Sequence, residues 1–272
     1  MEAAQPLEPA KQQAKIYAER DGEIGWIVFN QPAKRNAMSL DMWQALPDLI
    51  RDHVRDPAVR VILLRGAGNA AFVSGADISQ FESLRANLDQ AEVYNRATDV
   101  AQRAIKEAEK PTVAMIFGYC FGGGMGIASS CDLRIAAQSA RFRIPAARLG
   151  LAYSFDGIRH LMSLVGAAAA REIFLTAGVY NAEDMLRMGY LQRIFPDADL
   201  EEQARDYAGR IAANAPLTLQ SVKIAVSEAV KDPAARNIAK VEAAEKRCFA
   251  SEDYQEGRRA FMEKRDPVFK GI

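Results

Sequence analysis

The stretch GYCFGGGMGIASSCDLRI, residues 118–135, decides the fold, because it joins a strand pattern to a helical pattern through glycines. It holds five glycines and no charge before Asp132, and a β-branched apolar run at 111–118 leads into it. A helix that begins at glycines leaves backbone N–H groups free at its positive end, and a missing Cβ lets a ligand approach them. Two interpretations stay open: an anion or oxyanion site, or a tight strand-to-helix turn. The spacing matches neither G-x-x-x-x-G-K-[ST] nor G-x-G-x-x-G, so a phosphate loop is excluded.

A second glycine turn lies upstream in AFVSGADISQF, residues 71–81. A short strand ends at Ser74, and the following glycine lets the chain turn sharply. The Asp77 side chain can tie the loop back by accepting from nearby N–H groups. The N–H of Ala76 is then expected to point outward.

Secondary structure is expected to alternate between strands and helices before becoming helical. The runs KIYAER (15–20) and IGWIVFN (24–30), separated by Asp-Gly, predict a β-hairpin. Ser39 is placed to cap an amphipathic helix, Pro47 predicts a kink in it, and His53 is expected to be solvated at its end. Further strands are predicted at 59–66, 111–118 and 191–195, and helices over 79–109 and from 157 onward. This order predicts an α/β body with a helical C-terminal appendage.

Composition excludes several classes of protein. The 272 residues suffice for one large domain with an appendage, and no Pro-, Ser- or Gly-rich linker divides them. With 35 basic and 35 acidic side chains the net charge is zero, which argues against a nucleic-acid partner. Three cysteines without C-x-x-C spacing argue against disulfide or zinc sites. Residues 1–12 lack an apolar signal region, and the uncharged run 111–131 is too rich in glycine for a membrane helix. We therefore expect a disordered lead over 1–12, no membrane partner and a cytoplasmic location.

Several segments, in this order and spacing, resemble the enoyl-CoA hydratase/isomerase, or crotonase, superfamily. They are NQPAKRNAMS (30–39), AFVSGADI (71–78), GYCFGGGMGIASSCDLRIAA (118–137), ARFRIPAARLGL (140–151) and SEDYQEGRRAFMEKRDPVFKG (251–271). The resemblance implies a crotonase-like α/β spiral of ββα repeats over 13–205 and a C-terminal helical trimerisation region over 206–272. It also implies a homotrimer or homohexamer, an acyl-CoA substrate, and no metal or separate cofactor, since coenzyme A enters with the substrate.

The resemblance assigns roles to both glycine turns. The N–H groups of Ala76 and Gly123 are expected to hold the thioester oxygen of an acyl-CoA, which becomes an enolate oxygen in the transition state. Such a donor is typically worth about 2.7–4 kcal/mol in a site with little water. Coenzyme A is expected along these residues: Lys34, Arg35, Ala37, Ser74, Asp77, Ile78, Ser79, Gly122 and Lys270.

The chain departs from the family's hydratases at both of their glutamates. Those enzymes hold water between two glutamates, because hydration needs one group to take a proton from water and another to deliver one to carbon. The glutamate that follows the glycine triplet is replaced by Gly126, and the one after F-x-x-P is replaced by Ala146. Relatives with other chemistry place an acid where this chain has Ser154. Simple hydration is therefore doubtful, and isomerisation or dehalogenation is weakened.

Polar side chains near these positions offer substitutes. ARLGLAYSFDGIRHL resembles methylmalonyl-CoA decarboxylases around Tyr153, although those proteins carry histidine where this chain has Ala76. Tyr153 is interpreted either as a polar contact or proton donor, or as a packing residue of the pocket wall. Asp156 is interpreted as the N-cap of the next helix or as a recruited acid, and His160 as a packed or surface histidine.

These residues favour an enzyme that stabilises a thioester enolate and performs decarboxylation or other enolate chemistry. Loss of CO₂ from a malonyl-type thioester requires no base, so an oxyanion hole and one hydroxyl suffice. Two alternatives stay open. One is an enoyl-CoA hydratase or isomerase that uses Asp156, and the other is an acyl-CoA-binding protein without catalytic activity.

Overall fold

The computed structural model describes residues 13–77 and 88–272. The expected disordered lead over 1–12 and the candidate coenzyme A contacts Ile78 and Ser79 lie outside the described residues. In the described part of the chain no helix is long and apolar enough to cross a membrane. Within the same residues, His, Cys, Asp and Glu side chains form no group of three or more that could hold a metal ion.

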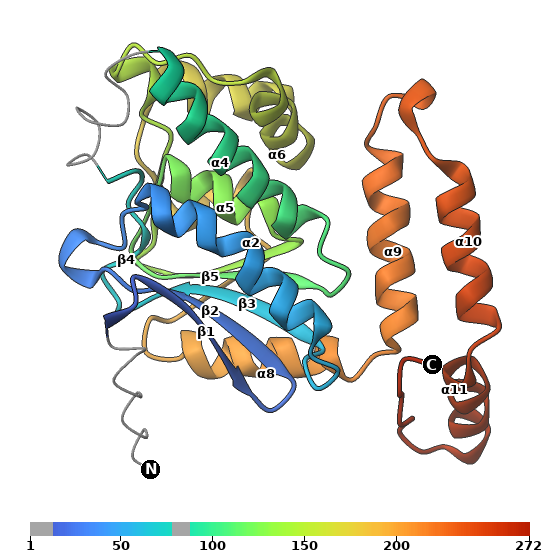
Figure 1. Cartoon of the computed structure of the whole chain (residues 1–272). Helices are drawn as coiled ribbons and strands as arrows, with labels where there is room; N and C mark the ends of the chain where they lie inside the picture. The colour runs from blue at the N-terminus through green and yellow to red at the C-terminus, as the bar shows by residue number, and fades with distance from the viewer. Residues whose placement is uncertain (1–12, 78–87) are drawn as a thin grey trace.

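A six-stranded sheet forms the centre of the body (Figure 1). Its order is β1 (Ile16–Asp21), β2 (Ile24–Phe29), β3 (Val61–Gly66), β5 (Thr112–Ile116), β7 (Leu133–Ala137) and β10 (Arg193–Phe195). The predicted hairpin is confirmed, since β1 and β2 pair antiparallel around Gly22, whose φ is +58°. The other neighbours pair in parallel, so the sheet must be covered on both faces, which explains its apolar strands.

A second, four-stranded sheet has the order β4 (Ala71–Val73), β6 (Tyr119–Phe121), β8 (Arg141–Arg143) and β9 (Tyr180–Asn181). Successive strands of the chain alternate between the sheets: β3, β5 and β7 belong to the first, and β4, β6 and β8 to the second. A helix follows each such pair of strands. The predicted spiral of ββα repeats is confirmed.

Helices cover both faces of the large sheet. On one face lie α2 (Leu40–Arg55), α4 (Leu88–Lys106) and α5 (Gly123–Ser130), and on the other lies α8 (Leu200–Ala212) (Figure 1). Helix α8 buries Leu200, Ala204, Ala208 and Ala212, whose four-residue spacing puts them on one helix face. The body is completed by α6 (Phe155–Thr176), which is interrupted at Gly166, by α7 (Ala182–Arg187) and by the 3₁₀ turns η1 (Pro32–Lys34) and η3 (Ala146–Arg148).

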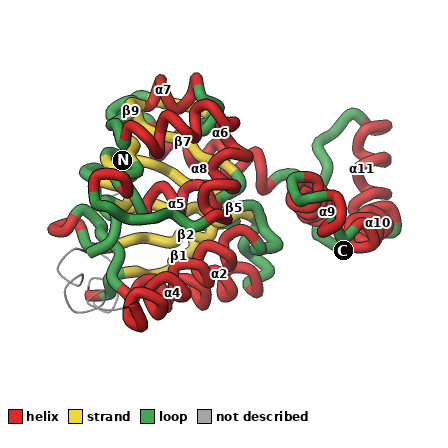
Figure 2. The backbone as a smooth tube through the Cα atoms, turned by 90° about the horizontal axis from the view of Figure 1, so that it is seen from above, coloured by secondary structure: helices red, strands yellow, loops and turns green. Residues whose placement is uncertain are grey.

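The C-terminal helices lie to one side of the body (Figures 1 and 2). They are α9 (Pro216–Ala229), α10 (Ile238–Phe249) and α11 (Glu252–Glu263), with the 3₁₀ turn η4 (Pro233–Ala235) between the first two. Lys223 of α9 fastens them to the body, because its Nζ lies 2.5 Å from Asp132 Oδ2 and donates to the Lys110 carbonyl at 2.8 Å. The boundary expected between 205 and 206 falls inside α8, and the packing on the sheet continues to Ala212.

Helix α2 contains Pro47 and continues to Arg55, so the kink expected at this proline stays a prediction. One detail differs from the sequence-based expectation. His53 is buried rather than solvated: its Nε2 lies 3.0 Å from the Trp26 carbonyl oxygen, and its ring packs over Gly25, where a Cβ would approach it to 2.7 Å. Burial lowers the pKa of His53, so the imidazole is neutral and serves packing.

Candidate active site

Each glycine of the triplet has its own structural reason. Gly122, the N-cap of α5, has φ +48°, a conformation that side chains disfavour. Gly124 lets α5 approach β4 closely, since a Cβ there would lie 2.3 Å from the Val73 carbonyl oxygen. Gly123 is the first residue of α5, so its N–H points out of the helix end, and Trp43 stands 3.1 Å from where its Cβ would be.

The upstream turn, residues 74–77, directs the N–H of Ala76 away from the segment with which its neighbours pair. Gly75 has φ +121°, and its carbonyl accepts from Met38 N at 2.8 Å. Asp77 N donates to the Met38 carbonyl at 2.9 Å. Since Gly75 and Asp77 both direct these groups toward Met38, the N–H of Ala76 between them points the opposite way. The hydrogen bonds of Gly75 and Asp77 are thus compatible with an outward direction of this N–H.

The two glycine turns lie against each other. A Cβ on Gly122 would be 3.9 Å from Gly75 Cα, and one on Gly123 would be 3.9 Å from the Gly75 carbonyl carbon. Within residues 13–77 and 88–272, the N–H groups of Ala76 and Gly123 have no hydrogen-bond acceptor. Two backbone donors from separate ββα repeats are therefore available on facing turns, at the positive end of α5.

Most of the residues expected to contact coenzyme A gather beside this pair of turns. Lys34 Nζ lies 2.7 Å from Asp77 Oδ2, so Asp77 holds the 31–37 loop instead of only its own turn. Ser74 N donates to the Arg35 carbonyl at 3.1 Å, and the Arg35 guanidinium lies 5.0 Å from the Tyr119 ring centroid. Ala37 follows in the same loop and is buried. The 34–38 and 74–77 segments thus form one edge that carries cationic side chains.

Asn36 holds this edge and was missed by the sequence analysis. It is fully buried at φ +56°, and its Nδ2 donates to the Ala71 carbonyl at 2.8 Å and the Ala67 carbonyl at 3.1 Å. Gln31 N donates to its Oδ1 at 3.0 Å. A single side chain thus pins the 31–37 loop onto the β3–β4 connection. An asparagine inside a loop rich in turn residues could have signalled this role, because asparagine tolerates positive φ.

Trp43 is a second residue that the sequence analysis did not single out. Its indole Nε1 donates to Tyr94 Oη of α4 at 2.8 Å, which fixes the ring where it covers Gly123. The apolar ring beside a free N–H keeps water away from one side of the donor, which strengthens a hydrogen bond made there.

Neither position that carries a glutamate in the family's hydratases offers an acid here. A Cβ on Gly126 would lie 2.5 Å from Gln102 Nε2 of α4, so a neutral carboxamide covers this glycine. Ala146 opens η3 and is buried, directly after Pro145, whose Cδ would be 3.8 Å from a Cβ on Gly122. Both positions thus lack a carboxylate in this chain.

The residue that caps α6 differs from the predicted one. Ser154, and not Asp156, is the N-cap of α6, with its hydroxyl accepting from Gly157 N at 3.2 Å. Asp156 is in the first turn, with its side chain 85% exposed and an ion pair to Arg159 at 3.6 Å. The interpretation of Asp156 as N-cap is wrong, because the chain enters the helix two residues earlier and a serine hydroxyl is already in place.

Tyr153 and His160 are both packed against the body. The Tyr153 ring lies 4.9 Å from that of Phe174, and burial raises the pKa of its phenol to about 12. The phenol has no hydrogen-bond partner within the described residues. His160 Nε2 donates to the Ser129 carbonyl oxygen at 2.7 Å, and burial lowers the pKa of His160 to about 4. His160 is thus the packed histidine that the sequence favoured.

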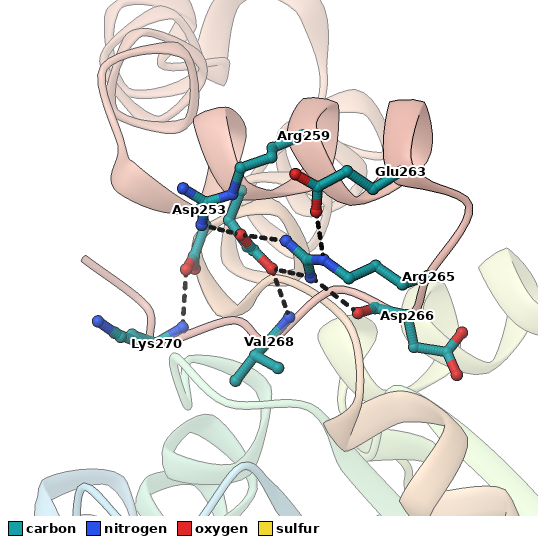
Figure 3. Close-up of polar contacts among 8 residues, drawn as sticks. Asp253, Arg259, Glu263, Arg265, Asp266, Val268 and Lys270 are labelled. Atoms are coloured by element: carbon teal, nitrogen blue, oxygen red, sulfur yellow. Dashed lines mark hydrogen bonds and ion pairs between the residues drawn. The ribbon is translucent and has the colours of Figure 1, made fainter.

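Lys270 lies apart from the glycine turns of its own chain. Its N–H donates to Asp253 at 2.7 Å. The neighbouring Phe269 carbonyl accepts from Arg60, which lies at the N-terminal end of β3. Both glycine turns instead follow the C-terminal ends of their strands, β4 and β6. Figure 3 shows the tail fastened to α11 by the Lys270 N–H on Asp253 and by Arg265 on Glu263. Hydrogen bonds from Arg265 and Val268 hold the pKa of Glu256 well below its usual range.

Residues 19–272 match the sequence profile described as Enoyl-CoA hydratase/isomerase. The chain belongs to this family. It is 32% identical over 254 residues to the crotonyl-CoA hydratase of Syntrophomonas wolfei, covering 93% of this chain and 97% of that protein. It is 31% identical over 250 residues to the short-chain-enoyl-CoA hydratase of Clostridium acetobutylicum, covering 92% and 95%.

A solved structure of the family has the same fold. The enoyl-CoA hydratase/carnithine racemase of Magnetospirillum magneticum superposes with a TM-score of 0.91 at 32% identity, covering 96% of this chain and 97% of that one. The chain is accordingly an acyl-CoA enzyme of the enoyl-CoA hydratase/isomerase family.

Proposed function

We propose that this enzyme stabilises a thioester enolate and decarboxylates a malonyl-type acyl-CoA. One observation carries the proposal: the unpaired N–H groups of Ala76 and Gly123 lie on facing turns, while Gly126 and Ala146 provide no carboxylate beside them. The first feature supports a negatively charged thioester oxygen, and the second removes the acid and base that hydration needs.

The reaction balances with the groups at hand. The bond between the α carbon and the carboxylate carbon breaks, and CO₂ leaves. Its electron pair moves into the thioester as an enolate, whose oxygen accepts hydrogen bonds from Ala76 N and Gly123 N. The α carbon then takes up one proton, and the product is the acyl-CoA shortened by CO₂. No proton is removed from carbon at any step, so the missing glutamates are not required.

Tyr153 is the proposed donor of that proton. Its raised pKa, about 12, keeps the phenol protonated at neutral pH, so it can donate but not act as a base. Water returns a proton to the phenolate afterwards. The packing on Phe174 holds the ring at a fixed angle.

The proposed binding mode places the coenzyme A along the edge formed by the 34–38 and 74–77 segments. Lys34 and Arg35 supply positive charge for its phosphates, and Gly122 lets the pantetheine pass closely. The enzyme is proposed to act as a homotrimer or homohexamer in which Lys270 approaches the coenzyme A of another subunit. Neither a metal ion nor a separate cofactor takes part in the proposed reaction.

The test is a set of separate incubations of the purified enzyme with malonyl-CoA, methylmalonyl-CoA and crotonyl-CoA. We expect release of CO₂ from a malonyl-type substrate, with acetyl-CoA or propionyl-CoA identified by mass. A Tyr153→Phe variant is expected to lose activity by about 10²-fold while keeping its melting temperature. Intact malonyl-type substrates together with fast turnover of crotonyl-CoA would overturn the proposal.

The names of the relatives favour a second function, enoyl-CoA hydration. In that case Asp156 is the candidate acid, but it would have to leave its ion pair with Arg159 and turn inward from an exposed position. An Asp156→Asn variant separates the cases. Loss of crotonyl-CoA hydration in this variant supports the second function, and full retention excludes the role of Asp156.

A further inference from the structure

The carboxamide of Gln102 lies over Gly126. A Cβ built on Gly126 would be 2.5 Å from Gln102 Nε2, 3.4 Å from its amide carbon and 3.8 Å from its Oε1. Nε2 is therefore the atom that comes nearest the helix backbone. Because only the flexible end of a side chain occupies this space, Gly126 leaves room for the amide of α4 on the surface of α5.

Helix geometry relates this amide to the oxyanion donors. Gly123 and Gly126 are three residues apart on α5, so they share one face and differ by about 4.5 Å along the axis. The space beside Gly123 meets Trp43 of α2, and the space beside Gly126 meets Gln102 of α4. An acyl group that extends from Gly123 N along this face of α5 would meet the Gln102 carboxamide.

The chemistry of the amide suits an acyl group with an oxygen anion. A carboxamide has two N–H donors and one acceptor, and it does not titrate, so it cannot replace a glutamate as general base. Gln102 is half-buried, and its carboxamide has no hydrogen-bond partner within the described residues. One turn further along α4 lies Lys106, a half-buried cation whose pKa is lowered by burial. A carboxylate placed here would accept from an amide N–H of Gln102.

We infer that Gln102 is a specificity-determining residue that donates an N–H to the carboxylate on the α carbon of a malonyl-type thioester. This inference rests on the proposed function of the same site. It explains why the chain combines Gly126 with a glutamine from another helix: the glycine opens the position, and the amide occupies it with a donor in place of an acid.

Binding of acetyl-CoA and sulfoacetyl-CoA, measured by calorimetry, tests this role without turnover. Sulfoacetyl-CoA carries a sulfonate in place of the carboxylate and cannot lose CO₂. The variants are Gln102→Leu, which removes the donor at similar size, and Gln102→Glu, which replaces it by an anion. Gln138→Glu, in an exposed turn, is the matched control for added charge.

The wild-type enzyme should bind sulfoacetyl-CoA more tightly than acetyl-CoA. Gln102→Leu should weaken sulfoacetyl-CoA binding by about tenfold to a hundredfold, the range for a hydrogen bond to a charged group, and Gln102→Glu by at least as much. Acetyl-CoA affinity should stay within about twofold of wild type in both variants and the control.

Three outcomes would overturn the inference. They are an equal wild-type affinity for the two ligands, a preference for sulfoacetyl-CoA that survives both variants, and an equal loss of affinity for both ligands, which indicates a structural role. A separate result would overturn the proposed function. The wild-type enzyme would then bind sulfoacetyl-CoA through Gln102 but leave malonyl-CoA and methylmalonyl-CoA intact. That result would refute decarboxylation and leave the binding role of Gln102 standing.

Discussion

Replacement of Gly123 by proline tests the oxyanion donor at the first position of α5. Gly123 is the first residue of α5, where proline is favoured because its fixed φ suits a helix and the missing N–H has no helical partner. Gly123→Pro therefore deletes the proposed donor without breaking an intrahelical hydrogen bond.

The steric cost can be separated by a matched variant. A Cβ at this position lies 3.1 Å from the Trp43 ring, so the ring must move by a few tenths of an ångström, and overpacking of this kind costs about 1–3 kcal/mol. Gly123→Ala adds the same Cβ but keeps the N–H. The difference between the two variants thus reports mainly the donor and the space in front of it.

Loss of one oxyanion donor typically costs about 2.7–4 kcal/mol, or 10²–10³ in kcat. We expect kcat of Gly123→Pro to fall below that of Gly123→Ala by this factor on the substrate that the wild type turns over. Circular dichroism and the oligomeric state would show that both variants are folded. A folded Gly123→Pro variant whose kcat is within about threefold of Gly123→Ala would refute the assignment of this N–H.

The other predictions concern stability. The pKa of His160 is lowered from 6.5 to about 4, so between these pH values the unfolded chain binds a proton that the folded chain excludes. About 3 kcal/mol of the free energy of unfolding, present above pH 6.5, should therefore be lost as the pH falls to 4. In urea denaturation, a His160→Gln variant should lose less of its free energy of unfolding over this pH range than the wild type. Gly124→Ala puts a Cβ 2.3 Å from a carbonyl oxygen of β4 and should lower the free energy of unfolding by about 1–3 kcal/mol or more. Gly209→Ala, which has open space around it in α8, should instead raise the free energy of unfolding by about 0.5–1 kcal/mol. Equal melting temperatures of the two variants would contradict this prediction. Lys223→Met leaves Asp132 without its cation and should raise the rate of amide hydrogen exchange in α9 more than in the large sheet. An unchanged exchange rate in α9 would show that this contact does not hold the helix.

Features that depend on local backbone conformation could be predicted from the sequence. The glycines at 75 and 122 adopt positive φ where the two motifs place sharp turns, and the β-branched density of 111–118 predicts β5. The alternation of strands between two sheets followed from the family resemblance, because a period of ββα units does not by itself say which strands pair.

Features that depend on contacts between distant segments could not be predicted. Gln102 and Gly126 are neighbours only because α4 crosses α5, and no local pattern marks a glutamine for that position. His53 is at a helix end that usually faces water, but the hairpin of β1 and β2 covers it. Ser154 and Asp156 are both good N-caps, and the residue at which α6 begins is set by its packing on the body.

The central claim is that this site forms a thioester enolate without an acid–base pair, and one competition experiment tests it most directly. Malonyl-CoA labelled with ¹³C in its free carboxylate and crotonyl-CoA are mixed in equal amounts with the wild-type enzyme and followed by NMR. We predict release of the label as CO₂ and bicarbonate while crotonyl-CoA stays unchanged. Conversion of crotonyl-CoA to its 3-hydroxy product, with the label retained in malonyl-CoA, would contradict the claim.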